Sequence, residues 1–167
     1  MYQPYPSGAQ MPEPQRPEPP PPMLMAVRLM YVGAGLSAIG IVLALVTIGS
    51  LKTAILKRHP LYTTSQVHSL QTAAVTSVVV GGLIAIGLWI LMARANGAGK
   101  SWARIVASVL FAINTLDLLA SAVQVHAPAS LAFAGLVWLA GLGATILLWR
   151  RESSQYYAAV SGQGAPA

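Results

Sequence analysis

The sequence contains no cysteine. Disulfides, thiolate metal sites and a cysteine nucleophile are therefore excluded, although this absence says nothing about the cellular compartment. Charged residues are also scarce, at 8% of the 167 residues, whereas 55% of the residues are hydrophobic. This balance is typical of a membrane protein and does not fit an ordinary soluble domain.

Acidic residues are particularly few, with four against ten basic residues, so the formal net charge is +6. The basic residues flank long apolar stretches, where they orient a membrane protein and meet anionic lipid head groups. The positive charge is therefore explained by membrane topology and does not indicate nucleic-acid binding.

Four apolar stretches are long enough to cross a bilayer core of about 30 Å. The predicted spans cover residues 25–50, 69–93, 102–125 and 130–149. Short connections force the spans into up-and-down order. The sequence therefore predicts an all-α fold, a four-helix transmembrane bundle that occupies residues 25–150.

The connection between the first two predicted spans also has a readable pattern. Leu51 and Ile55 suggest that the first helix continues for a turn or two beyond the membrane, and Pro60 ends it. Thr63 is one of several hydroxyl residues that can cap the next helix.

Both ends of the chain are predicted to be disordered cytoplasmic tails. Residues 1–24 hold nine of the twelve prolines, a composition that favours extended polyproline II and prevents core formation. Arg16, Pro19 and Pro22 match the spacing R-x-x-P-x-x-P, so this tail is either a ligand for a cytoplasmic partner or a solvated spacer. Residues 151–167 are polar and rich in Gly, Ser and Gln, which also predicts disorder.

The third predicted span carries the only acidic residue inside a long apolar stretch, Asp117. Helical spacing places Asn114, Ser121 and Gln124 on the same face as Asp117. A carboxylate at this depth costs roughly 3 kcal/mol on insertion scales, so it is paired, hydrated or protonated. Two interpretations stay open: a structural hydrogen bond between helices, or a proton or cation site.

Depth matching predicts which residues surround Asp117. The turn between the last two spans places Trp138 level with Asp117, and the indole N–H needs an acceptor in lipid. Counting inward along the second span reaches Thr76 and Ser77 at a similar depth. We therefore predict a polar cluster of Asp117, Asn114, Trp138 and Thr76 or Ser77 in the outer half of the bundle. Depth does not fix the rotation of a helix, so the alternative is that Trp138 faces lipid.

Other kinds of site find little support. The turn around Gly97 and Lys100 lacks the spacing of a phosphate-binding loop, and no strand precedes it. Three histidines, at positions 59, 68 and 126, fall near one side of the membrane without a neighbouring carboxylate, so no metal site or cofactor is predicted. Hydrolase motifs are absent, and Asp117 is the only intramembrane carboxyl, so we expect no enzyme.

One segment resembles a known group. The stretch MARANGAGKSWARIVASVLFAINTL, which follows a proline-rich tail and the span AVRLMYVGAGLSAIGIVLAL, is similar to uncharacterised small four-helix membrane proteins of actinobacteria. The most specific part is the junction of Gly99, Trp102, Ala103 and Arg104. The resemblance covers about residues 26–149. It implies a four-helix membrane fold in a bacterial cytoplasmic membrane, and it implies no activity.

Together these observations predict a multi-pass protein of the bacterial cytoplasmic membrane that acts without catalysis. It would work through helix–helix contacts with itself or a membrane partner, or through tail contacts with a cytoplasmic partner. The alternative is a small transporter or channel subunit that uses Asp117 as a proton or cation site.

The basic residues predict how the bundle is oriented. Seven lie on the side that holds both termini: Arg16, Arg28, Arg94, Lys100, Arg104, Arg150 and Arg151. Three lie on the other side: Lys52, Lys57 and Arg58. This bias places both termini in the cytoplasm, with a belt of Trp89, Trp102 and Trp149 at the cytoplasmic interface.

This topology can be tested by single-cysteine labelling, because the chain has no native cysteine. An impermeant maleimide applied to intact cells should label a cysteine placed at Thr53 and leave one at Gly162 unlabelled until the membrane is permeabilised. The reverse labelling pattern would invert the orientation.

Overall fold

The computed structural model describes residues 17–123 and 128–162. In this part of the chain the regular structure is entirely α-helical. The helices are α1 (Pro21–Val46), α2 (Ile48–Arg58), α3 (Thr64–Gly97), α4 (Ser101–Val123), α5 (Pro128–Leu148) and α6 (Arg151–Gly162).

Four helices are long and apolar enough to cross a membrane. The qualifying segments are Pro21–Val46, Thr64–Gly97, Ser101–Ala122 and Ser130–Leu148. They correspond one for one to the four predicted spans, which confirms the all-α prediction and makes the chain an integral membrane protein. Residues 124–127 of the turn between the last two spans lie outside the described residues.

The first predicted span ends earlier than expected. α1 stops at Val46, and Thr47 separates it from α2. The Thr47 hydroxyl donates to the main-chain carbonyls of Leu43 (2.9 Å) and Ala44 (3.2 Å). Such back-bonding competes with the helical ladder and bends helices, and hydropathy alone does not detect it.

The connection after α2 follows the prediction. α2 continues the chain to Arg58, and α3 then begins with a capping box. The Thr63 hydroxyl accepts from the Gln66 amide, and the Gln66 side chain accepts from the Thr63 amide at 2.9 Å. Both hydrogen bonds pair backbone amides that would otherwise have no partner at the start of a helix.

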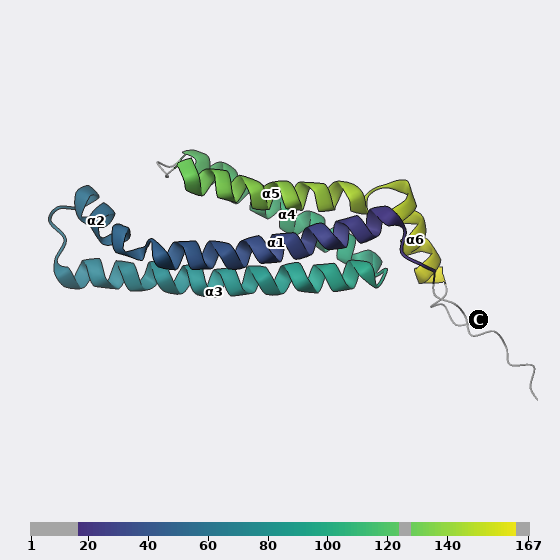
Figure 1. Ribbon diagram of the computed structural model, residues 1–167, viewed down its shortest axis with the longest axis horizontal. Helices are drawn as coiled ribbons and strands as arrows, with labels where there is room; N and C mark the ends of the chain where they lie inside the picture. The colour runs from purple at the N-terminus through teal and green to yellow at the C-terminus, as the bar shows by residue number, and fades with distance from the viewer. Residues whose placement is uncertain (1–16, 124–127, 163–167) are drawn as a thin grey trace, which may run out of the picture.

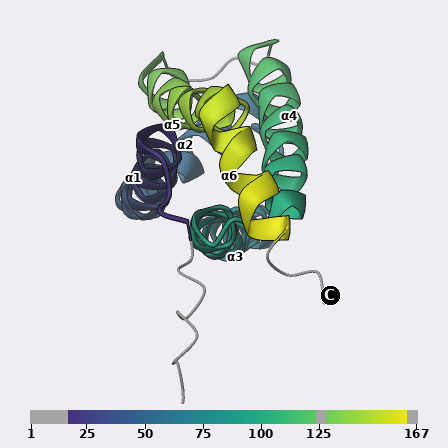
Figure 2. The same cartoon turned by 90° about the vertical axis from the view of Figure 1, so that its right-hand side faces the viewer.

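α1 lies between α3 and α5, and α4 packs against α5 (Figures 1 and 2). α4 begins beside the end of α3 and moves away from it toward the start of α5, so the contact between α3 and α4 is small (Figure 2). α1 and α3 also extend beyond α4 and α5 at the end that carries α2 (Figure 1). We call the two ends of the bundle the α6 end and the α2 end.

α1 and α3 approach closely where a glycine of one helix leaves room for a large side chain of the other. A Cβ atom on Gly33 of α1 would lie 2.7 Å from the Trp89 ring of α3, and one on Gly82 would lie 2.5 Å from Ile41. Without a hydrophobic drive between helices in lipid, such van der Waals contacts provide much of the association energy. These contacts explain why α1 and α3 lie side by side.

The contact with Gly33 corrects the prediction for Trp89. We expected Trp89 in an interfacial belt with Trp102 and Trp149. Its indole instead lies between helices, against Gly33 and near Gly141 of α5. Trp102 and Trp149 are about half exposed, at 48% and 53%.

The largest difference from the prediction is at the C-terminal tail. Residues 151–162 form α6, which crosses the end of the bundle (Figures 1 and 2), whereas residues 163–167 lie outside the described part. Ser153, Tyr156 and Tyr157 are buried against the bundle. The prediction of disorder is therefore wrong for residues 151–162, because composition was weighed above the helical spacing of these buried positions.

The N-terminal boundary also shifts. Residues 17–20 have no regular structure, but α1 already begins at Pro21, and Met23 is fully buried. Proline is tolerated in the first helical turn because the amide it lacks has no intrahelical partner there. The predicted tail therefore ends at residue 20, and residues 1–16 lie outside the described part of the chain.

A hydrogen-bond network attaches α6 to the end of α3. The Tyr157 hydroxyl donates to Oδ1 of Asn96 at 2.6 Å, and Nδ2 of Asn96 donates to the Met92 carbonyl at 2.8 Å. The Tyr156 hydroxyl donates to the Gly97 carbonyl at 3.0 Å. Burial raises the pKa of Tyr157, so its phenol stays a donor.

Replacing Tyr157 by phenylalanine should therefore destabilise the bundle. The buried Asn96 carbonyl would lose its donor, at a cost of about 1–3 kcal/mol. Unfolding in detergent followed by circular dichroism measures the loss. Tyr31→Phe is the matched control, because Tyr31 is 45% exposed on α1. Equal stability of the two variants would contradict the role of this hydrogen bond.

Candidate functional site

Asp117 lies on an exposed face of α4. Asn114 and Asp117 are both exposed, and Ser121 is half buried on the same face. Gln124, the fourth residue of the predicted polar line, lies outside the described residues. The structure thus keeps three of these residues on one face of α4, as helical spacing requires.

The depth of Asp117 follows from helix geometry. It is sixteen residues beyond Ser101, or about 24 Å along the helix axis at 1.5 Å per residue, and about 9 Å from the last residue of α4. This position is within the apolar span, toward the α2 end. No hydrogen bond or ion pair joins the Asp117 carboxylate to the described residues.

Trp138 meets a different partner from the one predicted. Its indole Nε1 donates to Oγ1 of Thr115 at 2.9 Å, and its ring lies 5.6 Å from that of Phe111. Thr115 is only two residues from Asp117, so the predicted depth is nearly right. Two residues correspond to a rotation of about 200° on a helix with 3.6 residues per turn. Trp138 therefore faces the opposite side of α4 from Asp117.

Thr76 and Ser77 are exposed on α3 and do not join Asp117 in a cluster. They line a shallow, mainly apolar surface of α3 together with His68 and Thr72. The Ser77 hydroxyl donates to the Ala74 carbonyl of its own helix at 2.9 Å. Because α4 turns away from α3, the polar residues of the two helices stay apart (Figure 2).

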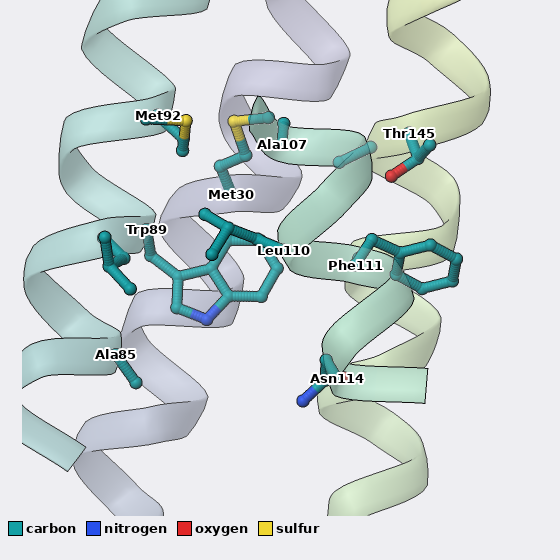
Figure 3. A pocket seen from close by; sticks show the side chains of 12 residues that line it. Met30, Ala85, Trp89, Met92, Ala107, Leu110, Phe111, Asn114 and Thr145 are labelled. Carbon is teal, nitrogen blue, oxygen red and sulfur yellow. The ribbon is translucent and has the colours of Figure 1, made fainter. Parts of the chain in front are cut away.

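A cavity of about 160 Å³ lies among α1, α3, α4 and α5. Its wall is almost entirely apolar, with Asn114 and Thr145 as the polar exceptions. Figure 3 shows that residues of α3 and α4 face each other across it, with Asn114 at one end and Met30 and Met92 at the other. The lining residues are Met30, Ala85, Leu88, Trp89, Met92, Ala107, Leu110, Phe111, Asn114, Gly141, Ala144 and Thr145.

A second polar site, which the sequence did not predict, lies under α6. The Arg104 guanidinium stacks on Trp149 at 4.4 Å and lies 5.2 Å from the Tyr157 ring, and Nη1 donates to the Ser154 hydroxyl at 3.2 Å. Its Nε is buried without a partner among the described residues. The aromatic faces stabilise the cation in place of a carboxylate.

His59 and His68, the histidines in the described part of the chain, are not arranged to hold a metal. Among the described residues, no three histidine or acidic side chains lie close enough to hold an ion. His59 stacks on Tyr62 with ring centroids 4.4 Å apart, and His68 is exposed on α3. His126 lies outside the described residues.

No known family, curated protein or solved structure matches this chain. At the candidate site, the Asp117 carboxylate is a hydrogen-bond acceptor that is exposed on a transmembrane helix, beside an apolar cavity.

A double-mutant cycle can test the partner of Trp138. Trp138→Phe and Thr115→Val each remove one side of the hydrogen bond, so their effects on stability should couple by about 0.6 kcal/mol, the average for such bonds in membranes. The control cycle combines Trp138→Phe with Asp117→Leu, which removes the carboxyl acceptor, and should show coupling near zero. Coupling only in the control cycle would restore the predicted cluster.

Proposed function

We propose that the protein is a non-enzymatic component of the bacterial cytoplasmic membrane that binds another transmembrane helix at the Asp117 face of α4. The observation that carries this proposal is the Asp117 carboxylate, which is exposed within an apolar span and pairs with none of the described residues. In this proposal the α6 end and both termini are cytoplasmic, in agreement with the distribution of basic residues.

The energetics favour a partner for this carboxyl group. A charged side chain facing lipid costs about 3 kcal/mol on insertion scales, and intramembrane ionisable residues usually face other helices or water. Ile113 and Leu116 beside it are 58% and 67% exposed, so apolar area is available around the polar centre. A hydrogen-bond donor on a partner helix would lower the free-energy cost of placing the Asp117 carboxylate in the membrane. The apolar residues would pack around that contact.

A second copy of the chain can supply the hydrogen-bond donor that Asp117 needs. Asn114 supplies amide donors one turn from the Asp117 acceptor on the same face. Two α4 helices related by a two-fold axis can therefore exchange donors and acceptors, as an isologous interface requires. The proline-rich residues 1–20 would provide any additional contact with a cytoplasmic partner.

Photo-cross-linking in native membranes tests the proposal. Benzoylphenylalanine at Ile113, next to Asp117 on the helix surface, should give a defined protein adduct. An adduct near 35 kDa, twice the 17.5 kDa chain, identifies a second copy. The matched control is Leu119, which is 59% exposed but faces away from Asp117, and should give lipid adducts only. Identical products from both positions would contradict the proposal.

Two substitutions then separate binding from ion handling. Asp117→Leu removes the acceptor and should abolish the adduct at Ile113, whereas Asp117→Asn retains hydrogen bonding and should preserve it. Proton or cation flux in proteoliposomes that Asp117→Asn abolishes, with the fold intact, would instead favour the transporter or channel function.

A further inference from the structure

The proposed helix contact does not involve the apolar wall of the cavity beside α4. It is bounded on α3 by residues from Ala85 to Met92 and on α4 by residues from Ala107 to Asn114. The two ends of each boundary are seven positions apart, so the cavity is about 10 Å long along the helices. We infer that it holds a segment of one acyl chain of a membrane phospholipid.

The size of the cavity limits the occupant. At about 160 Å³ it matches the 150 Å³ class of apolar cavities that stay dry and bind a six-carbon ring. A transmembrane helix is 10–12 Å wide and does not fit in this volume. A stretch of hydrocarbon chain fits, and the thioethers of Met30 and Met92 can adjust to its shape.

Buried side chains close the cavity at the α6 end. At the α6 end, the layer above it contains Met23, Ala93 and Leu148, each 0% exposed, together with the nearly buried Tyr157. This layer separates the cavity from water at that end. α3 and α4 make little contact with each other and diverge along their length (Figure 2). Since both helices are apolar enough to cross a membrane, a lateral route between them would lead to the hydrocarbon of the bilayer.

Charge near this opening favours a phospholipid over an uncharged hydrocarbon. Arg94 and Lys100 are both exposed near the connection between α3 and α4. Arg94 is two residues beyond Met92 along α3, so it lies only about 3 Å closer to the α6 end, although it points to the other side of the helix. Basic residues at this level attract lipid phosphates, so a head group beside them places its first chain carbons level with the cavity.

Trp89 makes the inference testable, because its indole lines the cavity (Figure 3). A variant that retains Trp89 as its only tryptophan is reconstituted into phosphatidylcholine vesicles whose acyl chains carry bromine, a contact quencher of indole fluorescence. We expect strong quenching of Trp89 although its ring lies between helices. A second variant that retains only Trp102, which is 48% exposed, reports quenching by the surrounding lipid.

Filling the cavity provides the decisive comparison. Ala85→Leu places a larger side chain in the wall and should reduce quenching of Trp89 at least threefold while leaving Trp102 unchanged. Ala112→Leu, on an exposed surface of α4 away from the cavity, is the matched control and should change neither signal. If the Trp89-only variant does not fold, subtracting the signal of Trp89→Phe from that of the native chain gives the same quantity.

Two results would overturn the inference. Unquenched Trp89 in the native cavity would mean that no acyl chain enters, and equal quenching with and without Ala85→Leu would place the quencher outside the cavity. Brominated phosphatidylglycerol, added at low mole fraction to unlabelled phosphatidylcholine, should quench Trp89 more than brominated phosphatidylcholine does. Equal quenching by the two lipids would refute the contact of the phosphate with Arg94 and Lys100. None of these outcomes depends on whether Asp117 binds a helix, so the two proposals can fail separately.

Discussion

The contact of Trp89 with Gly33 brings three of the four membrane helices together. The indole occupies space that any side chain at Gly33 would fill, and its far edge reaches the position of Gly141 on α5. One aromatic ring thus lies among three helices, α1, α3 and α5. Lipid tails are as apolar as the helix surfaces, so leaving lipid does not favour one helix arrangement over another. A close van der Waals fit such as this one does.

The same contact explains why one side of the bundle stays open. α1 packs against both α3 and α5, whereas α4 packs mainly against α5 and has only a small contact with α3. The hydrogen bond between Trp138 and Thr115 and the contact of the Trp149 indole with Ser108 at 2.9 Å both join α4 to α5. The α3-facing side of α4 receives no equivalent contact. The cavity and the Asp117 face are consequences of this asymmetric pairing.

The sequence predicts the spans well and their rotation poorly. Hydropathy depends on composition over about twenty residues, so it locates all four membrane helices correctly to within a few residues. Contacts depend on the angle at which each helix presents its residues. Depth counting placed Trp138 near Asp117, but its actual partner is Thr115, on the other side of the helix. Trp89 shows the same limit, because a tryptophan near a span end fits either an interfacial belt or an interhelical contact.

The C-terminal helix shows a second limit, which concerns polar segments. Residues 151–162 have the composition of a tail, yet the buried residues Ser153, Tyr156 and Tyr157 recur at helical spacing. Tyr157 contacts the polar side chains of Asn96 and Arg104, which are distant in sequence. Single-sequence reasoning finds apolar faces more readily than polar ones. The network at the α6 end could therefore be recognised only once the helices were placed together.

The two ends of the bundle consequently have different properties. At the α6 end, buried hydrogen bonds and aromatic contacts close the bundle around Asn96 and Arg104. Toward the α2 end, α4 separates from α3, and Asp117 and Asn114 are left exposed. Asn114 also lines the cavity, so a helix bound at Asp117 would border an acyl chain held there. Under the two proposals, that lipid would contribute part of the surface that the partner helix meets. The affinity of the contact would then depend on the lipid as well as on Asp117.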